Sequence, residues 1–91
     1  MNYWSSDLGL VSAGAVVEVA LTGNAANVML LDSSNFSSYE SGQSFRYVGG
    51  HYTRSPIRLT TPTAGHWYVL IDYGGGAGSG TASVRLLARR Q

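Results

Sequence analysis

The apolar residues of this chain come in short runs separated by glycine, serine, threonine and asparagine, and no run shows the spacing of a helix face. Twelve glycines supply many of these interruptions. Turn residues that recur at intervals of roughly 8–12 positions between β-branched and aromatic runs are typical of an all-β domain. The pattern therefore predicts about seven or eight short strands in an antiparallel two-sheet β-sandwich of the jelly-roll or Ig-like kind.

Six segments combine apolar alternation with β-branched or aromatic residues, and we predict that they are strands. In Ala15–Leu21, alternation turns Val17 and Val19 toward the core and Glu18 toward water. Asn27–Asp32 is apolar on both faces, as expected of a central or covered strand. In the last, Val84 and Leu86 should face inward. The segments are Tyr3–Leu8, Ala15–Leu21, Asn27–Asp32, Ile57–Thr61, Trp67–Tyr73 and Thr81–Ala88.

Three glycine-rich or polar stretches connect these strands. Gln43–Val48 and His51–Arg54 flank two glycines, and this arrangement predicts a β-hairpin with a two-residue turn. Ser33–Gly42 is polar with two embedded aromatic residues, and we expect a long loop there. Gly74–Gly80 has the glycine spacing of a phosphate-binding loop, but Thr81 stands where that motif has lysine. We therefore interpret it as a connection between the last two strands.

Two amino acids are missing from the chain, and both absences exclude particular chemistries. Without cysteine there is no disulfide, no thiol nucleophile and no thiolate metal ligand. All six basic residues are arginines, so lysine Schiff-base chemistry and a P-loop lysine are also excluded. The 91 residues predict a single domain, 1–91. A domain this small usually needs reinforcement, and we expect a homo-oligomer.

The charge of the chain is low and balanced. Its formal net charge is +1, and charged residues make up 12% of the sequence. Binding of duplex nucleic acid requires clustered positive charge, so we do not expect it. The N-terminal residues lack the basic start and apolar stretch of a signal peptide, and the longest apolar run is interrupted by Glu18. We expect a cytoplasmic protein that does not engage a membrane.

Three stretches carry a resemblance to a known family: Gly23–Tyr39, Thr53–Leu59 and Gly65–Asp72 with the glycines that follow. They resemble a small bacterial family, the domain of unknown function numbered eighteen-eighty-three, and the resemblance runs over almost the whole chain. Members of that family occur alone or joined to TIR domains. The resemblance implies a β-sandwich and, by analogy, a place in bacterial signalling or defence. It brings no catalytic or binding residues to this sequence.

Arginine and tyrosine gather around the predicted hairpin. Both residue types are enriched at binding hot spots, because arginine offers a rigid fork of donors and tyrosine a large amphipathic face. Such a surface would suit an anionic or planar ligand. The alternative is that the tyrosines fill sheet positions and the arginines solubilise an outer face. The candidate binding residues are Arg46, Tyr47, His51, Tyr52, Arg54 and Arg58.

The residues that could support catalysis or metal binding are scattered. Neither His51 nor His66 lies in a nucleophile or zinc-ligand pattern, so we expect no catalytic residue, no metal and no cofactor. A calcium ion could gather Asp32 and Asp72 from separate loops. Single loop aspartates more often bond to nearby backbone amides in turns, and we favour that interpretation.

Three hypotheses about function follow, from different classes. The leading hypothesis is a non-catalytic recognition module that engages a protein or a small anionic ligand through the arginines and tyrosines. The second is a structural homo-oligomerisation unit that pairs through exposed strand edges or the tyrosine-rich face. The third, an enzyme, requires histidine and serine side chains within hydrogen-bond reach inside a pocket.

Overall fold

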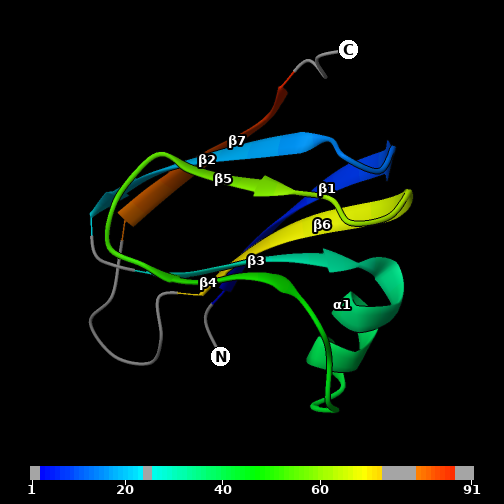
Figure 1. Cartoon of the computed structure of the whole chain (residues 1–91). Coiled ribbons are helices and arrows are strands. Elements are labelled where there is room, and N and C mark those ends of the chain that lie inside the picture. The colour runs from blue at the N-terminus through cyan, green and yellow to red at the C-terminus, as the bar shows by residue number, and fades with distance from the viewer. Residues whose placement is uncertain (1–2, 24–25, 73–79, 88–91) are drawn as a thin grey trace.

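Seven strands and one short helix make up the described part of the chain, residues 3–23, 26–72 and 80–87 of the computed structural model (Figure 1). The strands form two antiparallel sheets packed face to face, as the sequence predicts. The elements are β1 (Tyr3–Val11), β2 (Val16–Gly23), β3 (Ala26–Asp32), α1 (Ser33–Glu40), β4 (Val48–Tyr52), β5 (Ile57–Thr60), β6 (Gly65–Asp72) and β7 (Gly80–Leu87).

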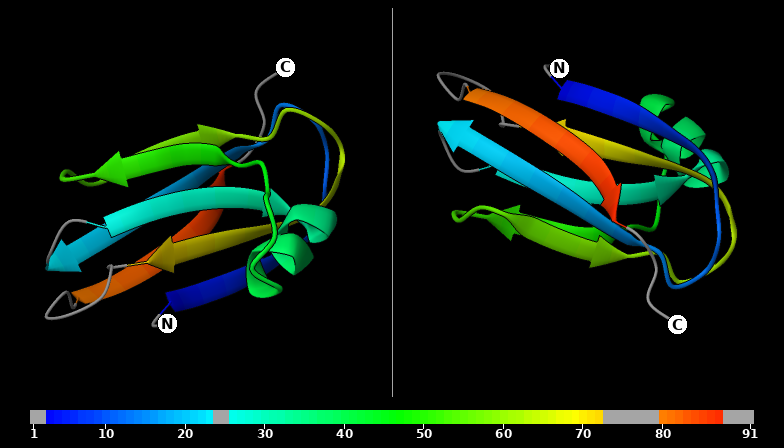
Figure 2. Two further views of the ribbon diagram at one scale, coloured as in Figure 1. Left: turned by 90° about the horizontal axis from the view of Figure 1, so that it is seen from below. Right: turned by 90° about the horizontal axis from the view of Figure 1, so that it is seen from above.

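One sheet has four strands in the order β1-β6-β3-β4, and the other has three in the order β5-β2-β7. Two views onto the faces of the sheets show the edge strands β1 and β7 on one side of the sandwich and β4 and β5 on the other (Figure 2). The segment between β4 and β5 crosses from one sheet to the other, so that second side is closed by the chain itself. Among the described segments, none joins β1 to β7 on the other side.

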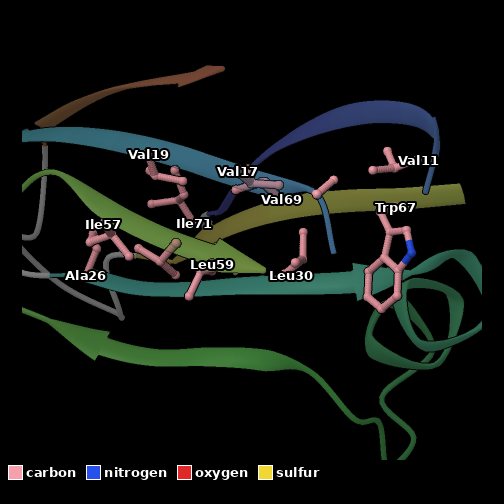
Figure 3. Close-up of a cluster of buried hydrophobic side chains, with 12 residues drawn as sticks. Val11, Val17, Val19, Ala26, Leu30, Ile57, Leu59, Trp67, Val69 and Ile71 are labelled. Carbon is pink, nitrogen blue, oxygen red and sulfur yellow. The ribbon is translucent and has the colours of Figure 1, made fainter. Parts of the chain in front are cut away.

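The main core fills the space between the sheets with branched aliphatic side chains (Figure 3). Val17 and Val19 of β2 are fully buried and face Val28 and Leu30 of β3, so the predicted inward face of β2 is confirmed. A fully buried valine or leucine contributes about 1.5–3 kcal/mol relative to an exposed one. This layer therefore supplies most of the driving force that fixes the two sheets together.

A second apolar layer lies on the outer face of the four-stranded sheet. Met29 and Leu31 of β3 and Leu70 of β6 are buried there. Phe36 and Tyr39 of α1 pack over them from outside, joined by a phenylalanine from the segment before β4. The prediction that Asn27–Asp32 is central and covered is confirmed, because β3 lies between β6 and β4 and is buried on both faces.

The prediction of a loop over Ser33–Gly42 is wrong, because residues 33–40 form α1. Serine and asparagine have low helix propensity, so local composition did not reveal it. The side chain of Asp32 caps the helix by accepting a hydrogen bond from the Asn35 amide at 2.9 Å. The helix ends before Gly42, whose φ of 75° suits the left-handed conformation that often terminates helices.

The prediction of a hairpin at Gly49-Gly50 is also wrong. Both glycines lie inside β4, which pairs with β3 along its whole length, with Gly49 opposite Met29 and Gly50 opposite Val28. Gly49 has a φ of 128°, and a Cβ atom at this position would collide with the Val28 carbonyl oxygen. This glycine therefore allows close approach of two backbones rather than a turn, a second common role of glycine in strands.

Two smaller predictions about side-chain orientation need correction. Glu18 lies on the outer face of β2 but is only 8% exposed, because arginines from the neighbouring strands cover it. On β7, Val84 packs against the core as predicted, whereas Leu86 is 48% exposed on that edge strand. The predicted connection Gly74–Gly80 lies outside the described residues except for Gly80, which is the first residue of β7. The one helix in the described part of the chain is too short and too polar to cross a membrane.

Candidate functional site

A cavity of about 230 Å³ lies at the end of the sandwich where β3 passes into α1. Four segments that are distant in the sequence contribute to it: the β3–α1 junction, the segment that enters β4, the β5–β6 connection, and the start of β6. The lining residues are Asp32, Asn35, Arg46, Tyr47, Val48, Pro62, Thr63 and Trp67. The cavity therefore contains two of the six predicted binding residues, Arg46 and Tyr47.

A chain of hydrogen bonds holds the charged part of this cavity in place. Oδ1 of Asp32 accepts hydrogen bonds from the backbone amide and the side-chain amide of Asn35, at 2.9 and 2.8 Å. The Oδ1 atom of Asn35 in turn accepts a hydrogen bond from the backbone amide of Arg46 at 2.7 Å. Asn35 thus ties the segment before β4 to the first turn of α1, and this contact fixes the backbone from which the Arg46 guanidinium projects.

The opposite wall of the cavity is mainly apolar. Trp67, only 4% exposed, belongs to the main core and extends its indole toward the α1 end of the sandwich (Figure 3). Its Nε1–H donates to the Thr63 carbonyl oxygen at 2.9 Å, which fixes both the ring and the β5–β6 connection. Pro62 lies in the same connection. A tryptophan held in this way forms a rigid, mostly buried part of the cavity wall.

Aromatic side chains continue from the cavity across the outer face of the four-stranded sheet. Tyr47 is 48% exposed and contacts Phe45, with ring centroids 5.7 Å apart. Phe45 meets Tyr39 edge-to-face at 5.1 Å, and Tyr39 meets Tyr3 of β1 in the same way at 5.4 Å. These contacts orient Tyr47 at the rim of the cavity.

Arg46 differs from the two strand arginines in its electrostatic surroundings. Within residues 3–23, 26–72 and 80–87, its guanidinium has no ion-pair partner. Arg58 and Arg85, by contrast, both bond to Glu18, at 3.0 and 2.7 Å. An arginine without a carboxylate partner keeps its donor fork available for an incoming anion.

The other predicted site residues do not join Arg46 and Tyr47. His51 and Tyr52 lie at the far end of β4, and Tyr52 packs against the core. Arg54 is exposed in the connection between the sheets. Arg58 projects from the outer face of the other sheet. The six residues therefore form no single surface.

Arg58 instead belongs to a cross-strand ion-pair ladder. Glu18 of β2 lies directly opposite Arg58 of β5 and Arg85 of β7. Hydrogen bonds from Arg85 and then Arg58 lower the pKa of the Glu18 carboxyl. Opposite charges on adjacent strands stabilise the sheet, so this arrangement supports the interpretation of Arg58 as a structural residue.

The second histidine, His66, pairs with Asp7 on the outer face of the four-stranded sheet. Its Nε2 atom lies 2.6 Å from Oδ1 of Asp7, and its ring stacks on Tyr68 with centroids 5.0 Å apart. A hydrogen bond from the Gly9 amide is the main cause that lowers the pKa of Asp7, and His66 adds to it. In the part of the chain that the structure describes, no three histidine, aspartate or glutamate side chains gather as a candidate metal site.

Sequence reasoning missed most of this cavity. Asp32 was considered as a calcium ligand or a turn residue, and its helix cap agrees with the second interpretation. The spacing from Asp32 to Asn35, with aromatic residues at positions 36 and 39, is the signal that could have revealed α1 and its junction with β3. Pro62, Thr63 and Trp67 carry no local signal, because only the fold brings them beside Arg46.

Comparison with known proteins places the chain in a family. The family model described as Domain of unknown function (DUF1883) matches residues 1–90. No curated protein and no solved structure matches the chain. The match agrees with the resemblance seen in the sequence and covers all the described strands. The chain therefore belongs to the DUF1883 family, whose function the family description leaves open.

Proposed function

We propose that this domain is a non-catalytic recognition module, and that the cavity between α1 and the β5–β6 connection binds a small planar group bearing a single negative charge. The observation that carries the proposal is the position of Arg46. Its guanidinium has no ion-pair partner among the described residues, and its backbone is tied to Asn35 beside a cavity walled by Trp67. A guanidinium that is available for an anion, beside a rigid wall that includes an indole, suits a small planar acid.

The size of the cavity limits the ligand. A volume of about 230 Å³ is below the roughly 300–1,000 Å³ of typical small-molecule pockets. It corresponds to roughly seven or eight water molecules at about 30 Å³ each. A benzene ring with one acid group fits within this volume, whereas a whole nucleotide would extend beyond it into solvent. The natural occupant is then a small aromatic acid, or a similar group on a larger molecule or protein.

The charge of the cavity limits the ligand further. Asp32 lies in the same lining as Arg46, and its carboxylate is engaged with Asn35. A dianion would therefore meet one cation and one carboxylate, and repulsion from the carboxylate would offset part of the attraction. We expect a monocarboxylate to bind better than a phosphate monoester of the same ring.

A thermal-shift comparison of benzoate, phenyl phosphate, adenosine monophosphate and acetate tests this proposal. Benzoate is expected to raise the melting temperature most, because it alone combines one charge with a ring of the right size. A ligand at 100 times its dissociation constant adds about 2.7 kcal/mol to the free energy of unfolding. A flat response to benzoate, or a larger response to adenosine monophosphate, contradicts the proposal.

Two matched variants make the test specific. Arg46→Gln should abolish the benzoate response, because it removes the only cation that lines the described cavity. Arg54→Gln removes an arginine that is also exposed but lies in the inter-sheet connection, and it should leave the response unchanged. If Arg54→Gln abolishes the response and Arg46→Gln does not, the site has been placed wrongly.

The family resemblance extends the proposal to a biological setting. Its TIR-joined members support a role in bacterial signalling or defence, with the domain acting in the cytoplasm. Catalysis is the alternative, and a serine hydroxyl within hydrogen-bond reach of a histidine would favour it. The hydrogen bond that the structure gives to the His66 side chain goes to the carboxylate of Asp7 instead.

A further inference from the structure

The edge of β1 is open over a long stretch of strand. β1 runs from Tyr3 to Val11 and pairs only with β6 within the described residues. The pairing is regular from Tyr3 to Asp7, and the register shifts between Asp7 and Gly9. One regular five-residue segment therefore presents unpaired backbone groups, which favours addition of another strand.

Exposed apolar side chains concentrate on this side of the sandwich. Within the described part of the chain, five large hydrophobic residues are substantially exposed, and three of them lie on β1: Tyr3, Trp4 and Leu10, at 36, 42 and 85% exposure. A fourth, Leu86, lies on β7, the edge strand on the same side (Figure 2). The fifth is Tyr47 at the rim of the cavity. Tyr3 packs on Tyr39 and donates its hydroxyl to Glu40 on the outer face of the sheet, whereas Trp4 points to the opposite face, so the β1 edge carries a partly exposed ring on each face.

The opposite side carries no comparable feature. Within the described part of the chain, no large hydrophobic residue of β4 or β5 is exposed. Prolines flank β5 at positions 56 and 62, and proline is a common protection of edge strands. β1 contains no proline, lysine or arginine, and its one charged residue, Asp7, is paired with His66. The two sides of the sandwich thus differ in the way expected if the β1 edge, and not the β4–β5 side, pairs with a strand of another molecule.

The sequence of β1 is complementary to itself in an antiparallel arrangement. If two copies pair about Ser5, Trp4 lies opposite Ser6 of the second copy and Tyr3 opposite its Asp7. Each bulky ring then faces a smaller residue, and no two carboxylates oppose each other. Like charges directly opposite each other destabilise a sheet, and this register avoids them. A two-fold axis through this pair gives a closed dimer, the commonest form of homo-oligomer.

We infer that β1 is a self-association edge, and that two copies of this chain pair antiparallel through residues 3–7 to join their four-stranded sheets into one. The second copy is favoured over a foreign strand because of this self-complementarity. The dimer also gives this domain of 91 residues without cysteine the reinforcement that small domains generally need.

The exposed area predicts that the association is weak. Aromatic side chains bury about 150–250 Å² when fully covered, so rings that are 36–42% exposed have about 60–100 Å² each left to bury. Two copies of Tyr3 and Trp4 with one strand edge fall below the roughly 1,200 Å² of stable interfaces. We therefore expect a dimer that dissociates in the micromolar range.

Sedimentation velocity from about 1 µM to about 1 mM tests the inference, because this range brackets a micromolar dissociation constant. We expect a monomer at the low end and a dimer at the high end. Trp4→Glu should raise the dissociation constant at least tenfold by placing a carboxylate in the paired edge. Tyr47→Glu is the matched control, since Tyr47 is similarly exposed but lies at the cavity rim.

Amide hydrogen exchange supplies a second readout that does not depend on the fold of the variant. Those backbone amides of residues 3–7 that point away from β6 should become protected as the concentration of the unmodified chain rises, while the amides of β5 should not change. A monomer over the whole range overturns the inference. So does a dimer that Tyr47→Glu breaks and Trp4→Glu leaves intact.

Discussion

Thr61 follows β5, and its one buried side chain joins the start of the β5–β6 connection to the β1–β2 connection. It is 1% exposed, and its Oγ1 atom accepts a hydrogen bond from the Ala15 amide at 3.0 Å while donating to the Ser12 carbonyl oxygen at 2.7 Å. The next two residues, Pro62 and Thr63, line the cavity. Thr61→Val keeps the shape of the side chain and removes both hydrogen bonds. It therefore measures how strongly the β1–β2 connection holds the cavity wall.

The expected cost of Thr61→Val follows from the groups left without partners. Ala15 is 5% exposed, so its amide loses its hydrogen bond in a place that water does not reach. Ser12 is exposed, so its carbonyl can bond to water instead. One unsatisfied buried donor costs about 1–3 kcal/mol, which for a domain of this size lowers the melting temperature by about 4–20 °C.

Denaturant and thermal unfolding of Thr61→Val and Thr60→Val provide the comparison. Thr60 precedes Thr61 and is exposed, so its substitution should change the free energy of unfolding by less than about 0.5 kcal/mol. Equal effects of the two substitutions would refute the reasoning that the Thr61 hydroxyl anchors the connection.

Two further predictions concern the backbone of β4 and the acid stability of the sheets. Gly49→Ala should destabilise the domain by at least about 1 kcal/mol in urea unfolding, because a Cβ atom there meets the Val28 carbonyl oxygen, whereas Gly50→Ala, with open space around it, should cost less. Thermal stability should fall as the pH drops below the ordinary carboxyl pKa values of 3.8 and 4.5, because the pKa of Asp7 is lowered by the Gly9 amide and that of Glu18 by Arg85 and Arg58. A carboxyl whose pKa is lower in the folded state than in the unfolded state stabilises the fold at any pH above its unfolded pKa. This stabilisation is lost as the pH falls through the folded-state pKa. Glu18→Gln should make the decline shallower, and an unchanged pH profile of melting temperature would contradict this.

The strands could be predicted because the pattern of apolar residues along each one indicates which of its faces are buried. β3 and β6 carry apolar residues on both faces, and each is buried on both faces in the structure. The helix could not be predicted from composition, because it depends on the Asp32 cap and on two aromatic side chains that pack on the sheet below. Tertiary packing commonly overrides weak local propensity in this way.

The candidate site was predicted only in part, for two physical reasons. Glycine permits both turns and close backbone contacts, so Gly49-Gly50 suggested a hairpin where the chain runs straight on beside β3. Arginine serves both binding and cross-strand pairing, and Arg58 proved to bond to Glu18 forty residues away in sequence. Arg46 and Tyr47 were among the predicted binding residues, but the cavity beside them depends on segments that only the fold brings together.

The central claim is that the cavity beside Arg46 is the ligand-binding site, and the two tryptophans of the chain test it most directly. Trp67 lines the cavity, whereas Trp4 lies on β1. Each indole N–H gives its own resonance in a nitrogen–proton correlation spectrum. In a titration with benzoate up to about 10 mM, we predict a saturable shift of the Trp67 indole that Arg46→Gln removes, with the Trp4 indole unmoved. A Trp67 indole that stays in place, or a shift of the Trp4 indole alone, would contradict the account.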